Sequence, residues 1–401
     1  MPALILKQGR EKSLLRRHPW IFSGAIHHAD ENIASGSTVD LLSFNKQFLA
    51  RASYSPESQI RARVWTFEDE PVDKEFFRKR IRSAITARSA IFLSPLAHLP
   101  QGDANALRLI YAESDNIPGL IVDRYGDVLV MQCLTAGTEY WKETFADLLL
   151  EETGLETIYE RSDADVRELE GLEQRVGILR GSILHDPLTI TENNLQFKVN
   201  LQTGHKTGFY LDQRRNRLRV RELAKDKDVL DCFCYTGGFT VNALAGGAKS
   251  VVSVDSSADA LTLAKENVAL NELPADKATF IQGDVFQLLR KFRDENRSFD
   301  MIILDPPKFA PTAAQAERAA RGYKDINLLA FKLLRAGGVL VTFSCSGGVD
   351  AGLFQKIIAG AALDAGVEAQ IVEHLSQGAD HPVSLHFPEG AYLKGLVCLK
   401  K

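Results

Sequence analysis

Cysteine is scarce in this chain of 401 residues, and its five cysteines form no Cys-x-x-Cys pair. The small, odd number argues against a disulfide scaffold, and the missing spacing argues against a zinc site. Long apolar runs are also missing, so no segment can span a bilayer as a helix. The first residues turn basic after a few apolar positions and lack the apolar core of a signal peptide. We therefore expect a cytoplasmic protein with no metal centre and no membrane partner.

Basic charge is not in excess over the whole chain, whose formal net charge is −4. It is concentrated locally, because residues 1–65 carry nine Lys or Arg against five Asp or Glu, and five arginines lie within residues 214–221. Such clusters can neutralise nucleic-acid phosphates, but they can equally form a solvated helix face. The candidate phosphate contacts in the first segment are Lys7, Arg10, Lys12, Arg16, Arg17, Arg61 and Arg63.

The length of the chain predicts two or three domains. Residues 1–75 are β-rich, with short strands at a spacing typical of a small barrel or sandwich. Residues 76–188 mix helices with strands, include a hairpin around Gly126, and show no evident chemistry. The expected strands of the first domain are residues 36–44, 48–54 and 59–67, and the expected helices of the second are 71–90 and 139–150.

Strands and helices alternate over residues 189–401, which indicates a mostly parallel sheet covered by helices on both faces. The final segment follows a short connection and is expected to pair antiparallel. The expected strands are residues 228–233, 250–255, 278–282, 299–305, 338–344, 368–375 and 391–399.

Acidic residues lie at the ends of three of these strands, where ligands of open α/β sheets bind. Asp231 precedes a Gly-rich turn, Asp255 is placed to accept from ribose hydroxyls, and Asp284 is placed to meet an adenine amino group. Each acid alone could merely cap a strand end, but three at successive strand ends favour a ligand. The turn is not Gly-x-Gly-x-x-Gly and no phosphate-binding Lys follows it, so S-adenosylmethionine is favoured over NAD or ATP.

A cysteine and an aspartate follow two strands that should be neighbours, Cys345 and Asp305. Adjacent strands lie ~4.8 Å apart, so both side chains can reach one base. A thiolate that adds to carbon 6 of a pyrimidine makes carbon 5 nucleophilic, and a carboxylate can accept from the exocyclic amine of cytosine. The other four cysteines are expected to be packing residues. Lys308 can contact phosphate or base, or face solvent.

Four strings together carry a family resemblance: residues 9–20, residues 204–214, Asp-Pro-Pro-Lys-Phe at 305–309 and Phe-Ser-Cys-Ser at 343–346. The chain resembles bacterial 23S ribosomal RNA cytosine-5 methyltransferases with an N-terminal PUA domain, over essentially its whole length. The resemblance implies three domains: a β-barrel-like PUA domain, a small central α/β domain, and a Rossmann-like class I methyltransferase domain with a seven-stranded sheet. It implies S-adenosylmethionine as cofactor, 23S ribosomal RNA as partner and 5-methylcytidine as product.

Carried over by motif, Cys345 matches the family's nucleophile. Many RNA cytosine-5 methyltransferases have a second cysteine where this chain has Pro307, so their two-cysteine release step cannot operate here. The arrangement is nearer that of uracil-5 enzymes, which leaves cytosine or uracil open on chemical grounds. The expected cofactor-binding residues are Phe209, Gln213, Asp231, Phe233, Tyr235, Thr236, Gly237, Gly238, Asp255, Ser256, Asp284 and Val285.

Three other functions compete with this interpretation. A guanine N-methyltransferase would use a related loop without a thiol, and an RNA-binding adaptor would carry a degenerate form of the fold. A nucleotide-dependent dehydrogenase is the more distant third. The sequence names neither the target nucleotide nor the base that removes the carbon 5 proton. It is compatible with a homodimer but does not fix the oligomeric state.

Overall fold

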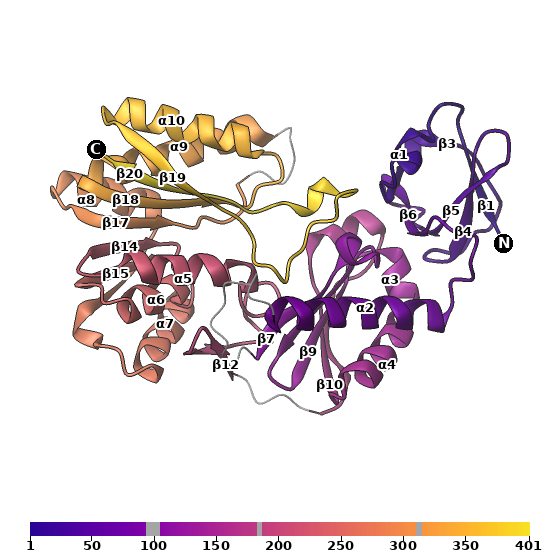
Figure 1. The fold of residues 1–401 in the computed structure, drawn as a ribbon, viewed down its shortest axis with the longest axis horizontal. Coiled ribbons are helices and arrows are strands. Elements are labelled where there is room, and N and C mark those ends of the chain that lie inside the picture. The colour runs from indigo at the N-terminus through magenta and orange to yellow at the C-terminus, as the bar shows by residue number, and fades with distance from the viewer. Residues whose placement is uncertain (94–104, 183–186, 310–314) are drawn as a thin grey trace. The chain divides into compact units, whose positions relative to one another are not determined.

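The computed structural model describes residues 1–93, 105–182, 187–309 and 315–401, which form two compact units (Figure 1). Unit 1 consists of Met1–Ile190, Val199–Leu211 and Ala379–Gly390. Unit 2 consists of Thr191–Lys198, Asp212–Gly378 and Ala391–Lys401. Within the described residues, no helix combines the length and the apolarity needed to cross a membrane.

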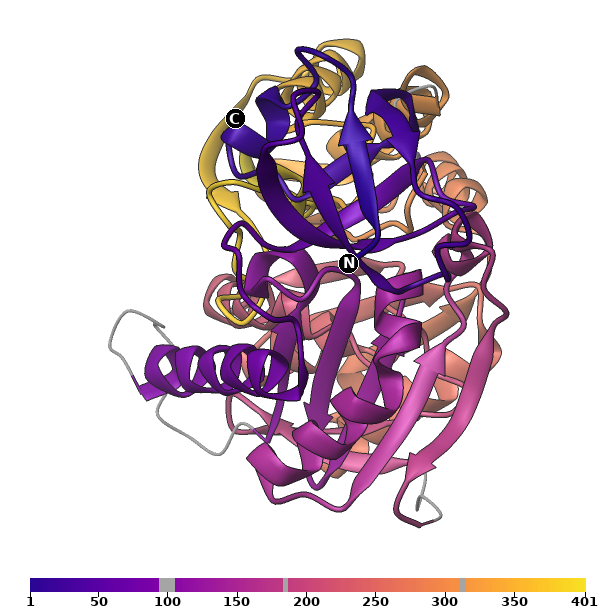
Figure 2. The same cartoon turned by 90° about the vertical axis from the view of Figure 1, so that its right-hand side faces the viewer.

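Unit 1 begins with a six-stranded sheet in the order β2-β6-β5-β4-β1-β3, drawn in indigo in Figure 2. Alternating apolar residues of these strands, such as Val39 and Leu41 or Ala62 and Val64, bury one face in a common core. The three strands expected from the sequence are confirmed. The bounds are β1 Ala3–Leu6, α1 Lys12–Leu15, β2 Trp20–Phe22, β3 Ile26–Ala29, β4 Thr38–Leu42, β5 Phe48–Tyr54 and β6 Ile60–Thr66.

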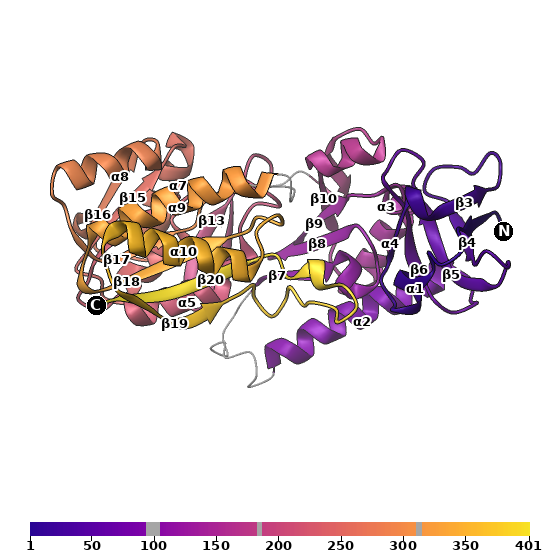
Figure 3. The same ribbon diagram turned by 90° about the horizontal axis from the view of Figure 1, so that it is seen from above.

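A second sheet of unit 1 has the strand order β11-β10-β9-β8-β7. Two helices, α2 and α4, contact each other and share one hydrophobic core with this sheet (Figure 3). The bounds are α2 Lys74–Leu93, β7 Ala106–Tyr111, β8 Leu120–Tyr125, β9 Val128–Cys133, α3 Ala136–Tyr140, α4 Lys142–Thr153, β10 Thr157–Ser162 and β11 Arg175–Arg180. A two-stranded sheet of β12 Leu188–Glu192 and β13 Leu195–Val199 follows.

Unit 2 contains a seven-stranded sheet in the order β16-β15-β14-β17-β18-β20-β19. The first five strands in this order are parallel, and β20 runs antiparallel to both of its neighbours. The expected mostly parallel sheet and its antiparallel last strand are therefore confirmed. The strands are β14 Asp228–Cys232, β15 Ser250–Asp255, β16 Ala278–Gln282, β17 Phe299–Leu304, β18 Leu334–Ser344, β19 Ala369–Leu375 and β20 Lys394–Lys400.

Helices cover both faces of this sheet (Figure 1). Three of them, α8, α9 and α10, share a hydrophobic core with the central strands, and α5, α6 and α7 pack in sequence on the other side. The bounds are α5 Arg214–Leu223, α6 Gly238–Ala245, α7 Ala258–Leu270, α8 Val285–Asp294, α9 Ala316–Leu333 and α10 Ala351–Ala365. Short 3₁₀ helices lie at Ser23–Ala25, Ala112–Asp115, Asp165–Glu170, Leu211–Gln213, Ala275–Lys277 and Pro388–Gly390.

Candidate cofactor and catalytic site

The parallel strands of unit 2 bring their carboxyl ends to one edge of the sheet. The pairings β16-β15-β14-β17-β18 place the loops after five strands side by side at this edge. The predicted acids and the predicted cysteine all lie at or just beyond these strand ends. The register thus collects the expected side chains where an open α/β sheet binds its ligand.

The turn after β14 is held in an unusual backbone conformation. Phe233 and Tyr235 adopt left-handed φ values of 62° and 47°, and Gly237 adopts 78°. A Cβ atom at position 237 would stand 2.9 Å from the Cβ of Ala264 on α7, so glycine is needed there for both space and backbone angle. Helix α6 begins at Gly238 with backbone N–H groups that can face a ligand.

Asp255 is fixed by the same turn. One carboxylate oxygen accepts a hydrogen bond from the Tyr235 N–H at 2.8 Å, and the other accepts from the Ser257 N–H at 2.9 Å. Each oxygen retains a second lone pair, so the carboxylate can still accept from two neighbouring hydroxyl groups. This arrangement fits the expectation that Asp255 accepts hydrogen bonds from ribose hydroxyls.

Asp231 is fully buried and only half satisfied. Its Oδ2 accepts from the Thr240 hydroxyl at 2.7 Å, whereas Oδ1 has no hydrogen-bond partner among the described residues. Burial raises the pKa of Asp231 to about 7, against the lowering effect of Thr240. A buried carboxyl oxygen without a donor fits a cationic or donor-rich ligand such as S-adenosylmethionine.

The remaining expected cofactor residues of unit 2 have more ordinary surroundings. Asp284 caps helix α8 by accepting from the Gln287 N–H at 2.9 Å, so its structural role is at the start of a helix and not at a strand end. Ser256 is exposed beside Asp255, and Val285 belongs to the hydrophobic core. Thr236 is buried, and its hydroxyl has no hydrogen-bond partner among the described residues.

Asp305 lies directly after β17 and contacts a residue expected to line the cofactor. It is partly buried, and the buried side chain of Gln213 donates a hydrogen bond to it. Burial and the neighbouring Asp212 raise the pKa of Asp305 to about 7, while the Gln213 bond lowers it. The sequence predicted both residues but gave no sign that they touch.

The loops after β17 and β18 meet, as expected. The Phe309 N–H donates to the Ser346 hydroxyl at 3.1 Å, and the same hydroxyl lies 2.9 Å from the Tyr323 hydroxyl of α9. Lys308, in the first loop, is exposed. Cys345 is partly exposed in the second loop, whereas the four other cysteines are buried. The expected nucleophile is therefore the accessible thiol of the chain.

Lys394 is a further residue of this site that no sequence motif indicates. It begins β20, and its Nζ donates to the Ser346 carbonyl oxygen at 2.8 Å, directly beside Cys345. A lysine at the start of a strand gives no local signal, because its neighbour across the sheet is set by long-range register.

The arginine cluster of α5 is mostly internal. Arg217 is buried, and its Nε lies 2.7 Å from Glu192, to which Arg214 is also paired at 3.5 Å. Arg219 pairs with Glu373 and Arg221 bonds to Asn242 and Asn193, which leaves Arg215 as the exposed member. The buried Arg214 and Arg217 therefore form neither a phosphate contact nor a solvated helix face.

The expected RNA-contacting residues of unit 1 differ in exposure. Lys7, Arg10, Lys12, Arg16 and Arg17 are exposed, and Arg61 is partly exposed. Arg63 is instead buried and ion-paired with Glu170 at 2.8 Å. Phe209, which the resemblance assigns to the cofactor, is also buried in unit 1, where its N–H donates to the Tyr125 hydroxyl at 3.2 Å.

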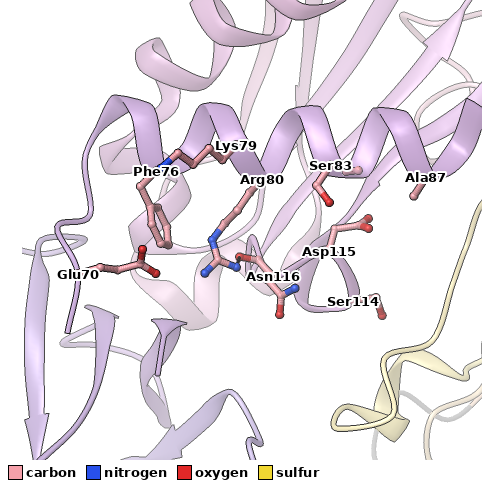
Figure 4. Close-up of a pocket in the computed structure, with 10 residues that line it drawn as sticks. Glu70, Phe76, Lys79, Arg80, Ser83, Ala87, Ser114, Asp115 and Asn116 are labelled. Carbon is pink, nitrogen blue, oxygen red and sulfur yellow. Dashed lines mark hydrogen bonds between the residues drawn. The ribbon is translucent and has the colours of Figure 1, made fainter. Parts of the chain in front are cut away.

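Unit 1 also contains a cavity of about 430 Å³ beside α2 (Figure 4). The Arg80 guanidinium on its wall lies 4.3 Å from the ring centroid of Phe76 and donates to the Asn116 carbonyl oxygen at 3.2 Å. Burial lowers the pKa of Arg80 to about 10. None of the site residues expected from the sequence lines this cavity. The described residues also contain no cluster of His, Cys, Asp or Glu side chains arranged to hold a metal ion.

Two family models match the chain. The model for S-adenosylmethionine-dependent methyltransferases matches residues 176–382, and the model for PUA-like domains matches residues 4–67. The latter range contains the six-stranded sheet of unit 1.

Curated relatives are similar over nearly the whole chain. Ribosomal RNA large subunit methyltransferase I of Tolumonas auensis is 53% identical over 98% of both chains. The protein of the same name from Vibrio cholerae is 50% identical over 99% of both chains.

Two solved structures are similar to this chain, and each alignment covers 100% of both chains. One is from Streptococcus mutans, with a TM-score of 0.84 and 21% identity. The other is complexed with SAH, with a TM-score of 0.85 and 22% identity. At this identity they show the shared fold alone.

Proposed function

Since the chain belongs to the S-adenosylmethionine-dependent methyltransferase family, we propose that it methylates carbon 5 of a cytidine in 23S ribosomal RNA in the cytoplasm. S-adenosylmethionine is the cofactor, and the unpartnered oxygen of Asp231 and the held carboxylate of Asp255 fit it. The ribosomal RNA substrate is the one that the names of the curated relatives state for those proteins.

The choice of carbon 5 depends on one observation, the contact between the two catalytic loops. The Phe309–Ser346 hydrogen bond brings the loop of Asp305 against the loop of Cys345. A carboxylate and an accessible thiol at one sheet edge can supply two groups that pyrimidine carbon methylation needs, one to orient the cytosine ring and one to attack carbon 6. A guanine N-methyltransferase would have no use for the thiol.

In the proposed reaction, bound S-adenosylmethionine supplies an electrophilic methyl group. The Cys345 thiolate uses a lone pair to form a bond to carbon 6 of cytosine, and the electrons of the 5,6 double bond make carbon 5 nucleophilic. After carbon 5 has gained the methyl group, it loses its proton to a base. The electrons of that C–H bond restore the double bond, and the S–C6 bond breaks to return the thiolate.

Asp305 orients the cytosine ring in this scheme. In its ionised form it accepts a hydrogen bond from the exocyclic amine of cytosine, and Gln213 holds the carboxylate in place. Because no second cysteine follows Pro306, the departure of Cys345 relies on the base that removes the proton. The exposed basic residues of the first 17 positions would hold the RNA backbone while the cytidine is flipped or already unpaired.

The thiol mechanism is tested by replacing Cys345 with Ala. In single-turnover assays on 23S RNA fragments, we expect Cys345→Ala to bind S-adenosylmethionine normally and to transfer no methyl group. The buried Cys398→Ala variant is the matched control and should keep activity. Near-normal methyl transfer by Cys345→Ala would exclude the proposal.

RNA that contains 5-fluorocytidine separates carbon 5 chemistry from guanine methylation. Fluorine cannot leave carbon 5 as a proton does, so an attacking thiol becomes trapped on the RNA. We expect a covalent adduct that resists denaturing electrophoresis with the wild type and none with Cys345→Ala. Methylation without any adduct would favour the guanine enzyme.

A further inference from the structure

Lys394 is placed beside the reactive cysteine by the register of the sheet. In the antiparallel pair β18-β20, Lys394 lies directly opposite Ser344, the residue before Cys345. Its Nζ then reaches past that position and donates to the Ser346 carbonyl oxygen at 2.8 Å. The backbone of Lys394 therefore pairs with the residue before Cys345, and its ammonium group binds the residue after Cys345.

The charged groups around this ammonium come from three other elements. Burial has the largest effect and lowers the pKa of Lys394, Cys345 and Asp350 act to raise it, and Lys308 acts to lower it. Asp350 caps helix α10 by accepting from the Leu353 N–H at 2.7 Å, and the exposed Lys308 is screened by water. The Tyr323 hydroxyl of α9 lies 2.9 Å from the Ser346 hydroxyl, and burial and Cys345 both raise the pKa of Tyr323. The half-buried cation of Lys394 is thus the least screened positive charge among these groups.

We propose that Lys394 is a positioning residue that holds the Cys345 turn through the Ser346 carbonyl and favours the thiolate form of Cys345. A thiolate is the nucleophilic form of cysteine, and a neighbouring lysine stabilises it. The inference deepens the proposed carbon 5 chemistry and rests on it for its catalytic meaning. The electrostatic effect itself is a property of the free protein and can be measured without RNA.

The same strand provides a matched control. Lys400 is the last residue of β20, and its Nζ also donates to backbone carbonyl oxygens, those of Phe331 and Leu334, at 2.9 and 2.6 Å. Burial also lowers its pKa. Lys400→Met therefore removes a similar partly buried cation and its carbonyl contacts, but at the far end of the strand from Cys345.

The experiment follows alkylation of Cys345 by iodoacetamide as a function of pH in the full-length protein without cofactor. Mass spectrometry of the Cys345 peptide isolates this thiol, and burial raises the pKa of the four other cysteines. We expect Lys394→Met to move the midpoint of the rate profile upward by about one pH unit, which is about a tenfold slower reaction at neutral pH. The plateau rate at high pH should stay unchanged.

Three further results decide the inference. Lys394→Arg keeps the charge and should keep the midpoint within a few tenths of a pH unit, and Lys400→Met should not move it. An unchanged midpoint in Lys394→Met overturns the inference, and so does a changed plateau with the wild-type midpoint, because that pattern is purely structural. If instead Cys345→Ala retains methyl transfer while Lys394→Met still shifts the midpoint, the proposed function fails and the electrostatic inference stands.

Discussion

At the scale of single residues, burial sets the chemistry of the site more than residue type does. Asp231 and Asp305 are ordinary carboxyl groups in the sequence, yet burial raises the pKa of each to about 7. Near neutral pH, a small change in surroundings therefore decides whether either group is charged. For Asp305 the ionised form is the one that accepts from a cytosine amine, so methyl transfer should increase as pH rises through about 7.

Asp231 also links stability to pH. Its pKa in the folded protein lies above the unfolded value of 3.8, so the folded state keeps a proton that the unfolded chain loses between those values. Stability from this group is present below pH 4 and is lost as pH rises to about 7, by up to about 4 kcal/mol. We expect Asp231→Asn to flatten the decrease in unfolding free energy between pH 4 and 8, measured by urea denaturation without cofactor.

The same substitution should weaken cofactor binding. Titration calorimetry should show a lower affinity of Asp231→Asn for S-adenosylmethionine, because the carboxylate would no longer face the cation. Asp259→Asn, at an exposed position of α7, serves as the control and should change neither quantity. An Asp231→Asn variant with the wild-type pH dependence of stability would contradict the assigned burial effect.

The sequence predicted which residues lie close together where those residues stand at the ends of neighbouring strands. Cys345 and Asp305 follow apolar runs, and parallel strands must bring such positions together. Pairing over long sequence distances was not predictable. Arg63 looks like a surface cation in an alternating strand, and nothing local indicates that Glu170 will neutralise it.

At the scale of secondary-structure elements, α5 shows that a basic run can form part of the framework. Arg214 and Arg217 point inward because Glu192, at the end of β12, provides a buried carboxylate for both. We expect Arg217→Ala to lower the free energy of unfolding by about 3 to 5 kcal/mol, since it leaves the Glu192 charge buried with weaker pairing. Urea denaturation monitored by circular dichroism measures this loss.

The neighbouring arginine supplies the comparison. Arg215 is exposed on the same helix, and Arg215→Ala should change stability by no more than about 0.5 kcal/mol. Equal effects of the two substitutions would mean that the buried ion pair does not hold α5 in place.

Central strands of unit 2 such as β17 and β18 were predictable because their apolar runs are nearly continuous and are separated by helical patterns. The helix expected at 139–150 was less simple, since the structure has two helices that break at Trp141. The first of them begins with a Thr135 capping box. Neither Gly nor Pro marks this break, so composition alone gave no stop signal.

At the scale of the whole molecule, the chain passes between its two units several times. Residues 199–211 and 379–390 return to unit 1 from the sequence that flanks unit 2. The amino-acid composition does not reveal these two segments, because each is short and is stabilised by contacts with residues distant in sequence. The net charge of −4 likewise gives no indication that the N-terminal segment is basic.

The salt dependence of RNA binding tests whether that segment contacts phosphates. Each phosphate contact adds about 0.7 to 0.9 to the slope of log affinity against log salt. We expect the double variant Arg10→Gln with Lys12→Gln to bind 23S RNA fragments more weakly and to reduce this slope by about 1.5 in filter-binding assays. Both side chains are exposed, so their replacement should not change the fold.

The control must remove the same charge from another place. Lys225 and Lys277 are exposed and precede the amino ends of β14 and β16, the edge of the sheet opposite the catalytic loops. Lys225→Gln with Lys277→Gln changes the net charge by the same amount and should leave the slope close to the wild-type value. If both double variants reduce the slope equally, the RNA responds to the overall charge of the protein, and the N-terminal segment has no direct phosphate contacts.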